Sequence, residues 1–202
     1  MVVFDATYLM HLFRPDIGPP RDSKTGLEIE KGQERLALLV ASLEKERTKV
    51  IVPTPALSEL LVRAGAEKSQ RIVEEISKSS VLRIEAFDGL AAIEVATMTR
   101  NAIAKGDKKD GISATWAKIK YDRQIVAIAK VHQATVIYSD DEDIKAHAEK
   151  VNIKVVKISD LPVPPEKPQL DMFEKASVAP DEAEVAVAEI QAQISGQSST
   201  EL

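Results

Sequence analysis

Short apolar runs rich in valine and isoleucine alternate along the chain with longer segments whose apolar residues recur at helical spacing. The runs predict strands at VVF (2–4), KVIVP (49–53), VLRIEAF (81–87), ATVIYS (134–139) and IKVVKI (153–158). The spacing between them predicts helices over roughly 33–47, 55–64, 67–79, 88–105, 122–133 and 141–150. This alternation favours an α/β layered fold with a mostly parallel sheet of about five strands, whose ligands bind outside the carboxyl ends of the strands.

Two segments do not follow the pattern. Residues 14–32 hold three prolines and three glycines and predict a long loop, which in a small domain is usually functional or mobile. VPPEKP, which starts at Val163, predicts an extended linker, and EAEVAVAEIQAQI (182–194) has the spacing of a helix. We therefore expect one domain over 1–161, followed over 162–202 by a linker and a partly helical acidic tail.

Composition limits the cellular compartments and the kinds of active site that the chain is expected to have. The 202 residues are 44% hydrophobic and 29% charged, as in ordinary soluble domains, and include no cysteine. Disulfides and thiolate metal sites are thereby excluded, and a reducing cytoplasm is the natural compartment. The start MVVFD lacks the basic and apolar regions of a secretory signal. The longest fully apolar run, 36–41, is far short of the roughly 20 residues that span a bilayer. We expect a cytoplasmic protein without a membrane segment.

The net charge of −5 is unevenly distributed. Residues 163–202 contain two lysines and eight acids, a net charge of −6, so residues 1–162 carry a net charge of +1. Because the acidity belongs to the tail, the overall charge does not argue against a nucleic-acid substrate.

Acidic residues gather where the predicted strands end. Asp5 follows the first strand, Asp122 opens a predicted helix, and the run DDED (140–143) follows the fourth strand, while Glu59 lies in the helix after the second strand. Each has a structural alternative: Asp5 and Asp122 could cap helices or turns, Glu59 could pair with Arg63 at i,i+4, and DDED could be a solvated loop.

Carboxylates that converge on one cleft repel one another unless a cation neutralises them. Hard oxygen ligands of this type suit Mg²⁺ or Mn²⁺, and the chemistry that follows is metal-assisted hydrolysis of a phosphodiester. Other site chemistries lack their motifs, because the sequence has no HExxH pair, no Walker A loop and no GxSxG elbow.

With these acids in order, the sequence resembles the PIN-domain family, in particular the VapC-like toxin ribonucleases. The resemblance covers roughly residues 1–160 and is carried by four stretches: VVFDATYLMHLF, VPTPALSELL, YDRQIVAIAKVHQATVIYSDD and SDDED. It implies a three-layer α/β/α sandwich and Mg²⁺- or Mn²⁺-dependent endoribonuclease activity. It also implies a protein antitoxin that masks the cleft, and often a homodimer. The long 14–32 loop and the acidic tail depart from the family pattern.

The resemblance also assigns roles to residues. Asp5, Glu59 and Asp122 match the first three acidic positions of the family, and Ser139-Asp140-Asp141 matches its fourth element. On that register Asp141 is the fourth catalytic acid and binds metal with Asp5 and Asp122, while a one-residue slip would make Asp140 the ligand. Supporting positions around these acids are Thr7, Ser139, which orients Asp5 or a neighbouring carboxylate, and Asp143.

A basic segment could hold RNA. Between residues 100 and 123 the chain has seven basic residues against three acids, together with two aromatic residues. Basic groups beside a metal cleft bind phosphates, and an exposed ring stacks on unpaired bases. The candidates are Lys118, Lys120, Arg123 and Trp116, although a solvated loop with Trp116 partly in the core fits the same pattern.

Two other functions remain open from the sequence. VVFDATYL loosely imitates the start of the haloacid-dehalogenase-like phosphatases, but that chemistry needs a second aspartate where this chain has Thr7. The chain could also be a non-catalytic PIN-like RNA-binding or interaction module of a larger assembly, with the tail from residue 163 as its docking peptide.

Overall fold

The structure is a computed structural model and describes residues 1–165, of which Met1–Pro164 form one compact unit. The helix expected over 182–194 lies outside the described residues. The domain boundary expected after residue 161 remains a prediction.

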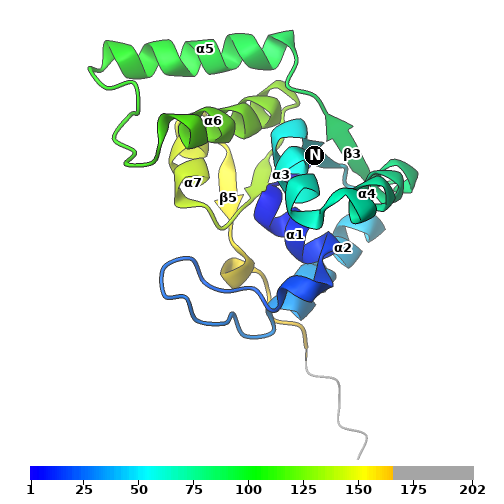
Figure 1. Cartoon of the computed structure of the whole chain (residues 1–202). Helices are drawn as coiled ribbons and strands as arrows, with labels where there is room; N and C mark the ends of the chain where they lie inside the picture. The colour runs from blue at the N-terminus through cyan, green and yellow to red at the C-terminus, as the bar shows by residue number, and fades with distance from the viewer. Residues whose placement is uncertain (166–202) are drawn as a thin grey trace, which may run out of the picture. The chain divides into compact units, whose positions relative to one another are not determined.

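Five parallel strands form one sheet in the order β3-β2-β1-β4-β5 (Figure 1). The first strand of the chain is central, so Val3 pairs with Ile51 on one side and with Ile137 on the other. The strands are β1 (Val2–Phe4), β2 (Val50–Pro53), β3 (Leu82–Glu85), β4 (Val136–Tyr138) and β5 (Lys154–Val156). The expected α/β class and the sheet of about five strands are confirmed.

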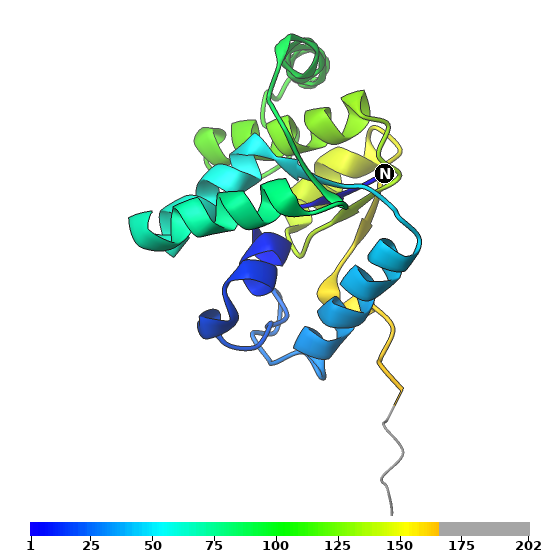
Figure 2. The ribbon, with the colours of Figure 1, turned by 90° about the vertical axis from the view of Figure 1, so that its right-hand side faces the viewer.

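Helices cover both faces of this sheet. Figure 2 shows α2 and α6 on opposite faces, with α5 stacked on the outer side of α6. The helices are α1 (Ala6–Phe13), α2 (Gly32–Lys45), α3 (Thr54–Ala64), α4 (Ala66–Lys78), α5 (Gly89–Ala104), α6 (Trp116–Val131) and α7 (Glu142–Glu149), with 3₁₀ turns η1 (Pro15–Ile17) and η2 (Ile158–Asp160). In residues 1–165 no helix has both the length and the apolar composition needed to cross a bilayer.

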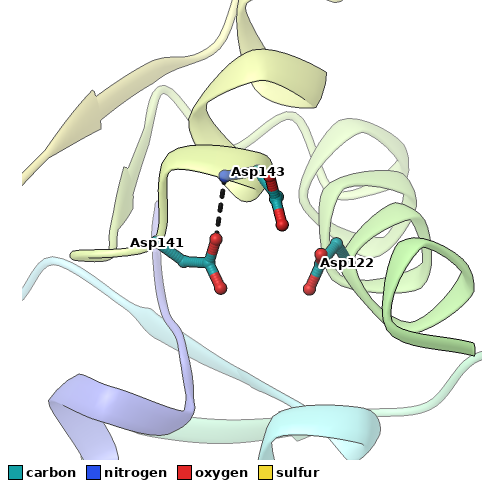
Figure 3. Close-up of side chains that lie close together, drawn as sticks. All are labelled: Asp122, Asp141 and Asp143. Carbon is teal, nitrogen blue, oxygen red and sulfur yellow. Dashed lines mark hydrogen bonds between the residues drawn. The ribbon is translucent and has the colours of Figure 1, made fainter. Parts of the chain in front are cut away.

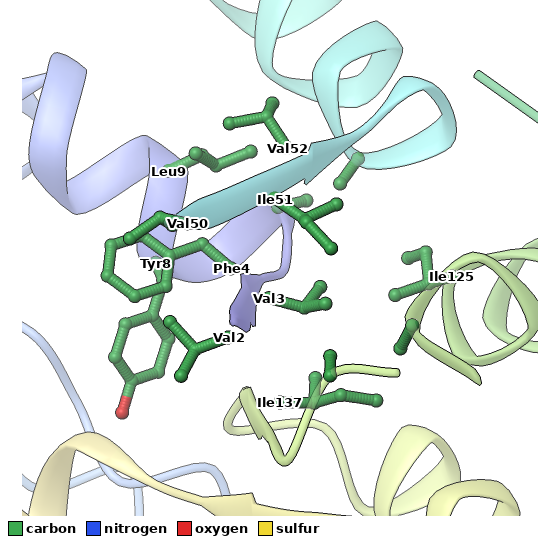
Figure 4. Close-up of a cluster of buried hydrophobic side chains, with 14 of the residues drawn as sticks. Val2, Val3, Phe4, Tyr8, Leu9, Val50, Ile51, Val52, Ile125 and Ile137 are labelled. Atoms are coloured by element: carbon green, nitrogen blue, oxygen red, sulfur yellow. The ribbon is translucent and has the colours of Figure 1, made fainter. Parts of the chain in front are cut away.

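The core follows the central strands. Val3, Ile51 and Ile137 are completely buried, and every residue of β1 and β2 is buried (Figure 4). A parallel sheet covered on both faces needs continuous apolar strands rather than alternating ones, which is the pattern of VVF and VIV in the sequence. Val126 and Ile128 of α6 are completely buried in the same core, so this helix is packed firmly against the sheet.

One expected boundary was wrong by six residues. The sequence predicts a helix from Asp122, but α6 begins at Trp116, where the Oγ1 of Thr115 accepts a hydrogen bond from the Lys118 amide. Asp122 therefore lies in the middle of a helix and is neither its N-cap nor a first-turn residue. The charged residues Lys118 and Lys120 obscured the apolar periodicity of the first turns.

Candidate functional site

A cleft of about 680 Å³ opens at the carboxyl ends of the central strands. It is walled by the start of α1, by α3, by α6 and by the start of α7. The carboxyl edge of a parallel sheet is where this fold class collects its ligands. Of the acids expected from the sequence, the cleft is lined by Asp5, Glu59, Asp122 and Asp141.

Three carboxylates converge between α6 and the start of α7, and two of them, Asp122 and Asp141, line the cleft. Asp122, Asp141 and Asp143 each offer an oxygen, and these oxygens all lie within 4.8 Å of one another. Figure 3 shows Asp122 on α6 and the other two at the start of α7, all facing the space between the two helices. The sequence assigned Asp143 only a supporting position, whereas the structure places it beside the two principal acids.

The start of α7 fixes two of these carboxylates. Asp141 is the N-cap of the helix, and its Oδ1 accepts a hydrogen bond of 2.8 Å from the Asp143 amide. The Asp141 amide in turn donates to the Oγ of Ser139 at 3.1 Å. An aspartate N-cap is stabilised by the amides and the positive end of the helix, so its position is well defined.

The ammonium of Lys118 lies between the three carboxylates. Its Nζ is 2.9 Å from Asp122, 2.8 Å from Asp141 and 2.6 Å from Asp143. Burial acts to lower the pKa of Lys118, but its hydrogen bonds to the three acids outweigh burial and raise that pKa above its ordinary value. In this structure Lys118 contacts the acids, and the contact with RNA expected from the sequence remains a prediction.

Asp5 is the most deeply buried acid of the cleft, at 2% exposure. Its Oδ1 accepts from the Tyr8 amide at 2.9 Å, which caps α1, and its Oδ2 accepts from the Oγ of Ser139. Burial raises the pKa of Asp5 to about 7, although both hydrogen bonds oppose the rise. The sequence expected Ser139 to contact Asp5 or a neighbour, and the hydroxyl contacts Asp5 and the Asp141 amide; its orienting role remains a prediction.

The pKa of Asp122 is also raised above its ordinary value. Burial raises its pKa to about 6, the hydrogen bond and charge of Lys118 act against that rise, and the charges of Asp141 and Asp143 reinforce it. A single ammonium against three carboxylates leaves the cluster with a formal excess of negative charge. Such a site favours a further cation.

Asp140 and Asp141 point in different directions. Asp140 is 8% exposed, and its Oδ1 accepts a hydrogen bond of 3.1 Å from the Ile158 amide, in the turn after β5. It does not line the cleft and does not belong to the carboxylate group. The expectation of Asp140 as a metal ligand therefore does not fit the structure, because its side chain points away from the carboxylate group and accepts from the Ile158 amide.

Two other expected residues line the cleft without joining the cluster. Thr7 lies at the start of α1 in the cleft wall. Glu59 is half exposed and forms an i,i+4 ion pair of 3.1 Å with Arg63, as its structural alternative anticipated. Its catalytic role remains a prediction.

The expected RNA-binding residues are scattered. Arg123 is 1% exposed and donates to the Oγ1 of Thr99 and to the Lys108 carbonyl, so the expectation that it binds RNA does not fit the structure. Trp116 lies beside Lys108 and Arg123 at cation–π distances, and neither Trp116 nor Lys120 lines the cleft. The aromatic residue of the cleft is Tyr121, which is 55% exposed. Tyr121 was not among the RNA-binding residues expected from the sequence, although it lies in the same basic segment.

The donor set fits a hard divalent cation. Carboxylate oxygens from Asp122, Asp141 and Asp143 provide the ligand type that Mg²⁺ and Mn²⁺ prefer, and the open cleft leaves room for water and a phosphate group. Lys118 already contacts the same carboxylates, so a metal that used all three would compete with its ammonium.

Comparison with known proteins gives a structural match only. No family model matches the chain, and no curated protein matches it significantly. The chain is similar to a chain of the crystal structure of VapBC2 from Rickettsia felis bound to a promoter DNA fragment. The TM-score is 0.53 at 12% identity, over 78% of this chain and 98% of that one. A chain of the DNA-bound VapBC structure from Salmonella typhimurium gives a TM-score of 0.46 at 13% identity, over 78% and 97% of the two chains. From its five-stranded parallel sheet and the first of these likenesses, the chain has a PIN-like fold of the VapC type.

Proposed function

We propose that this chain is a Mg²⁺- or Mn²⁺-dependent endoribonuclease that hydrolyses RNA phosphodiesters. The observation that supports it most strongly is the convergence of Asp122, Asp141 and Asp143 within 4.8 Å of one another, with Asp122 and Asp141 lining an open cleft. The three carboxylates share only one ammonium, that of Lys118, and the formal excess of negative charge that remains favours binding of a divalent cation.

We assign separate roles to the acids in and beside the cleft. Asp122, Asp141 and Asp143 would hold the ion, and a bound divalent ion supplies Lewis-acid stabilisation of the phosphodiester and lowers the pKa of water. Asp5, fixed by Ser139 and the Tyr8 amide, presents a fourth carboxylate whose ionisation a nearby cation would favour. Glu59 lines the same cleft, is half exposed and pairs with Arg63, and we propose it as a further catalytic acid.

The cleft also has groups suited to a flexible nucleic acid. Tyr121 exposes more than half of its surface next to Asp122, and a ring in this position can stack on an unpaired base. Arg63 and Lys118 line the same cleft and can contact phosphate groups. A single-stranded RNA segment therefore suits the site better than a rigid duplex.

We further propose that the chain acts as the toxin of a toxin–antitoxin pair. The support is the likeness in fold to a chain of a VapBC2 complex, together with the sequence resemblance to VapC-like ribonucleases. The proposed partner is an antitoxin protein that masks the acidic cleft, and a homodimer is the proposed assembly of the nuclease. Co-purification of the full chain with a candidate antitoxin, and loss of RNA cleavage in that complex, would test this part.

The nuclease proposal is tested with purified full-length protein on a structured RNA and on DNA of the same sequence, with Mn²⁺, with Mg²⁺ and with EDTA. We expect cleavage of RNA only, and only with a divalent ion. Asp122→Asn should reduce the rate by about 100-fold or more, because a neutral amide is a poor ligand for a hard cation.

The matched control is Asp88→Asn. Asp88 caps α5 outside the cleft by accepting from the Ala91 amide at 2.9 Å, and asparagine caps helices equally well. This variant should cleave RNA at the rate of the original protein. Equal rates for Asp122→Asn and Asp88→Asn would contradict the proposed site.

A non-catalytic RNA-binding or interaction module is the alternative, and one observation favours it. Lys118 already neutralises part of the carboxylate charge, so the cluster has an internal counter-ion without any metal. Absence of both Mn²⁺ binding and RNA cleavage, with RNA or partner binding retained, would support this alternative.

A further inference from the structure

The position of Lys118 distinguishes it from an ordinary surface lysine. It lies one helical turn before Asp122 on α6 and reaches across to both acids at the start of α7. Three carboxylates from two helices thus share one ammonium, at distances of 2.6 to 2.9 Å. A solvated i,i+4 pair is worth only a few tenths of a kcal/mol and would not gather two further acids.

The carboxylate oxygens around this ammonium stand farther from its centre than the ligands of a small divalent ion would. Mg²⁺ requires oxygens at about 2.0–2.1 Å in near-octahedral geometry. The carboxylate oxygens around Lys118 are held at the longer distances of an ammonium group. A divalent ion that used all three acids would therefore have to draw the oxygens inward and take the position now held by Nζ.

The Lys118 side chain can move into the cleft when an ion displaces it from the acids. Its side chain is 40% exposed and lines the cleft, and its four-carbon stem is flexible. The accessible space is the cleft itself, next to Tyr121, where the nucleic acid would lie. An ammonium released there would still be close to the acids and would be available to a phosphate oxygen.

We propose that Lys118 is a tethered counter-cation of the acidic cluster. It holds Asp122, Asp141 and Asp143 together in the metal-free protein, is displaced by the divalent ion, and then binds a phosphate of the RNA beside that ion. The second half of this proposal rests on the proposed nuclease function, whereas the competition between Lys118 and the ion does not. Lys118 thus competes with the metal for the three acids and contacts the substrate once it is displaced.

The competition is measured with Mn²⁺ alone. Calorimetric titration of the full chain carrying Lys118→Met should give a dissociation constant for Mn²⁺ at least about tenfold lower than that of the original protein. The reason is that the positive charge of Lys118 no longer opposes binding of the ion. Lys145→Met is the matched control: Lys145 lies on α7, is 43% exposed and pairs with Glu149 at i,i+4. Its Mn²⁺ affinity should equal that of the original protein.

Thermal unfolding in EDTA gives an independent readout. Without metal, Lys118→Met should unfold at a lower temperature than Lys145→Met, because the three carboxylates are left without their counter-ion. Addition of Mn²⁺ should restore more stability to Lys118→Met than to the original protein. If Lys118→Met fails to fold, Lys118→Gln, which keeps a hydrogen-bond donor without charge, replaces it in both measurements.

RNA cleavage separates the two halves of the proposal. At Mn²⁺ concentrations that saturate both proteins, Lys118→Met should have a KM for RNA about tenfold higher than the original protein, with a smaller change in kcat. Unchanged or weaker Mn²⁺ affinity in both Lys118 variants overturns the counter-cation, whatever the cleavage result. Tighter Mn²⁺ binding with no RNA cleavage by any form overturns the nuclease function and the phosphate contact, and leaves the competition standing.

Discussion

The Oγ of Ser139, at the end of β4, donates a hydrogen bond to the Oδ2 of Asp5, at the end of β1, across 134 residues of sequence. The same oxygen accepts from the Asp141 amide, so one hydroxyl joins the deepest acid of the cleft to the start of α7. Both strands are central neighbours in the sheet, which gives this contact a rigid base. This part of the acidic cleft is thus built on the ends of two neighbouring strands.

Removal of this hydroxyl should therefore destabilise the site. Ser139→Ala leaves the buried Asp5 carboxylate with one hydrogen bond fewer and should lower the free energy of unfolding by about 1–3 kcal/mol. Urea unfolding measures this, with Ser77→Ala as the control, because the hydroxyl of Ser77 only donates to a carbonyl of its own exposed helix. A loss no greater than that of Ser77→Ala would show that Ser139 is dispensable.

The stability of the metal-free protein should fall as the pH rises from about 4 to about 7. The pKa of Asp5 is about 7 in the folded state and near 3.8 when unfolded, so across this window the folded protein binds more protons than the unfolded chain. The raised pKa of Asp122, about 6, acts in the same direction. Deprotonation of a buried acid that lacks a sufficient counter-ion costs stability.

Asp5→Asn should remove much of this dependence. Each pKa unit corresponds to about 1.4 kcal/mol, so the variant should be more stable than the original protein at pH 8 by at most about 4 kcal/mol, and nearly equal to it at pH 4. Thermal unfolding in EDTA across this range provides the measurement. Parallel stability curves for the two proteins would show that Asp5 does not titrate as described.

Tyr121 should contribute to RNA binding without supporting the fold. Because its ring is 55% exposed in the cleft wall, Tyr121→Ala should weaken binding of single-stranded RNA by about 1–3 kcal/mol and leave the unfolding temperature unchanged. Tyr121→Phe keeps the ring and should bind RNA normally. Fluorescence anisotropy with a short labelled RNA distinguishes the variants, and normal binding by Tyr121→Ala would exclude stacking at this position.

Arg123, in contrast, should support the fold without contributing to RNA binding. Arg123→Met removes the donor to the Lys108 carbonyl and to Thr99, and should lower the free energy of unfolding by about 2 kcal/mol. Its RNA affinity in the folded state should match that of the original protein. Weakened RNA binding at unchanged stability would restore Arg123 to the nucleic-acid surface.

Much of the cleft could be predicted from strand ends. Asp5 and Asp141 follow strands that are neighbours in the sheet, and a parallel sheet brings such positions to the same edge. The alternation of side chains along an extended segment also separates Ser139 and Asp141 from Asp140, which points to the Ile158 amide. The register that made Asp141 the cleft acid agrees with this geometry.

The positions of Lys118 and Arg123 could not be predicted, because they depend on where α6 begins. Once the helix starts at Trp116, Ile119, Arg123 and Val126 fall on one buried face, and Lys118 falls one turn before Asp122 on another. With a start at Asp122, neither the burial of Arg123 nor the Lys118 cluster can be inferred. Thr115 caps the helix at this boundary, and α6 packs against α5 and α7, but only the cap can be read from the local sequence.

Asp140 and Asp141 offer the most direct test of the acidic cluster as a catalytic metal site. They are adjacent and chemically identical, but only Asp141 belongs to the carboxylate group, and asparagine preserves the cap at one position and the contact with the Ile158 amide at the other. Mn²⁺-dependent RNA cleavage should fall by about 100-fold or more in Asp141→Asn and by no more than about threefold in Asp140→Asn. Equal rates in the two variants, or a larger loss in Asp140→Asn, would contradict the account.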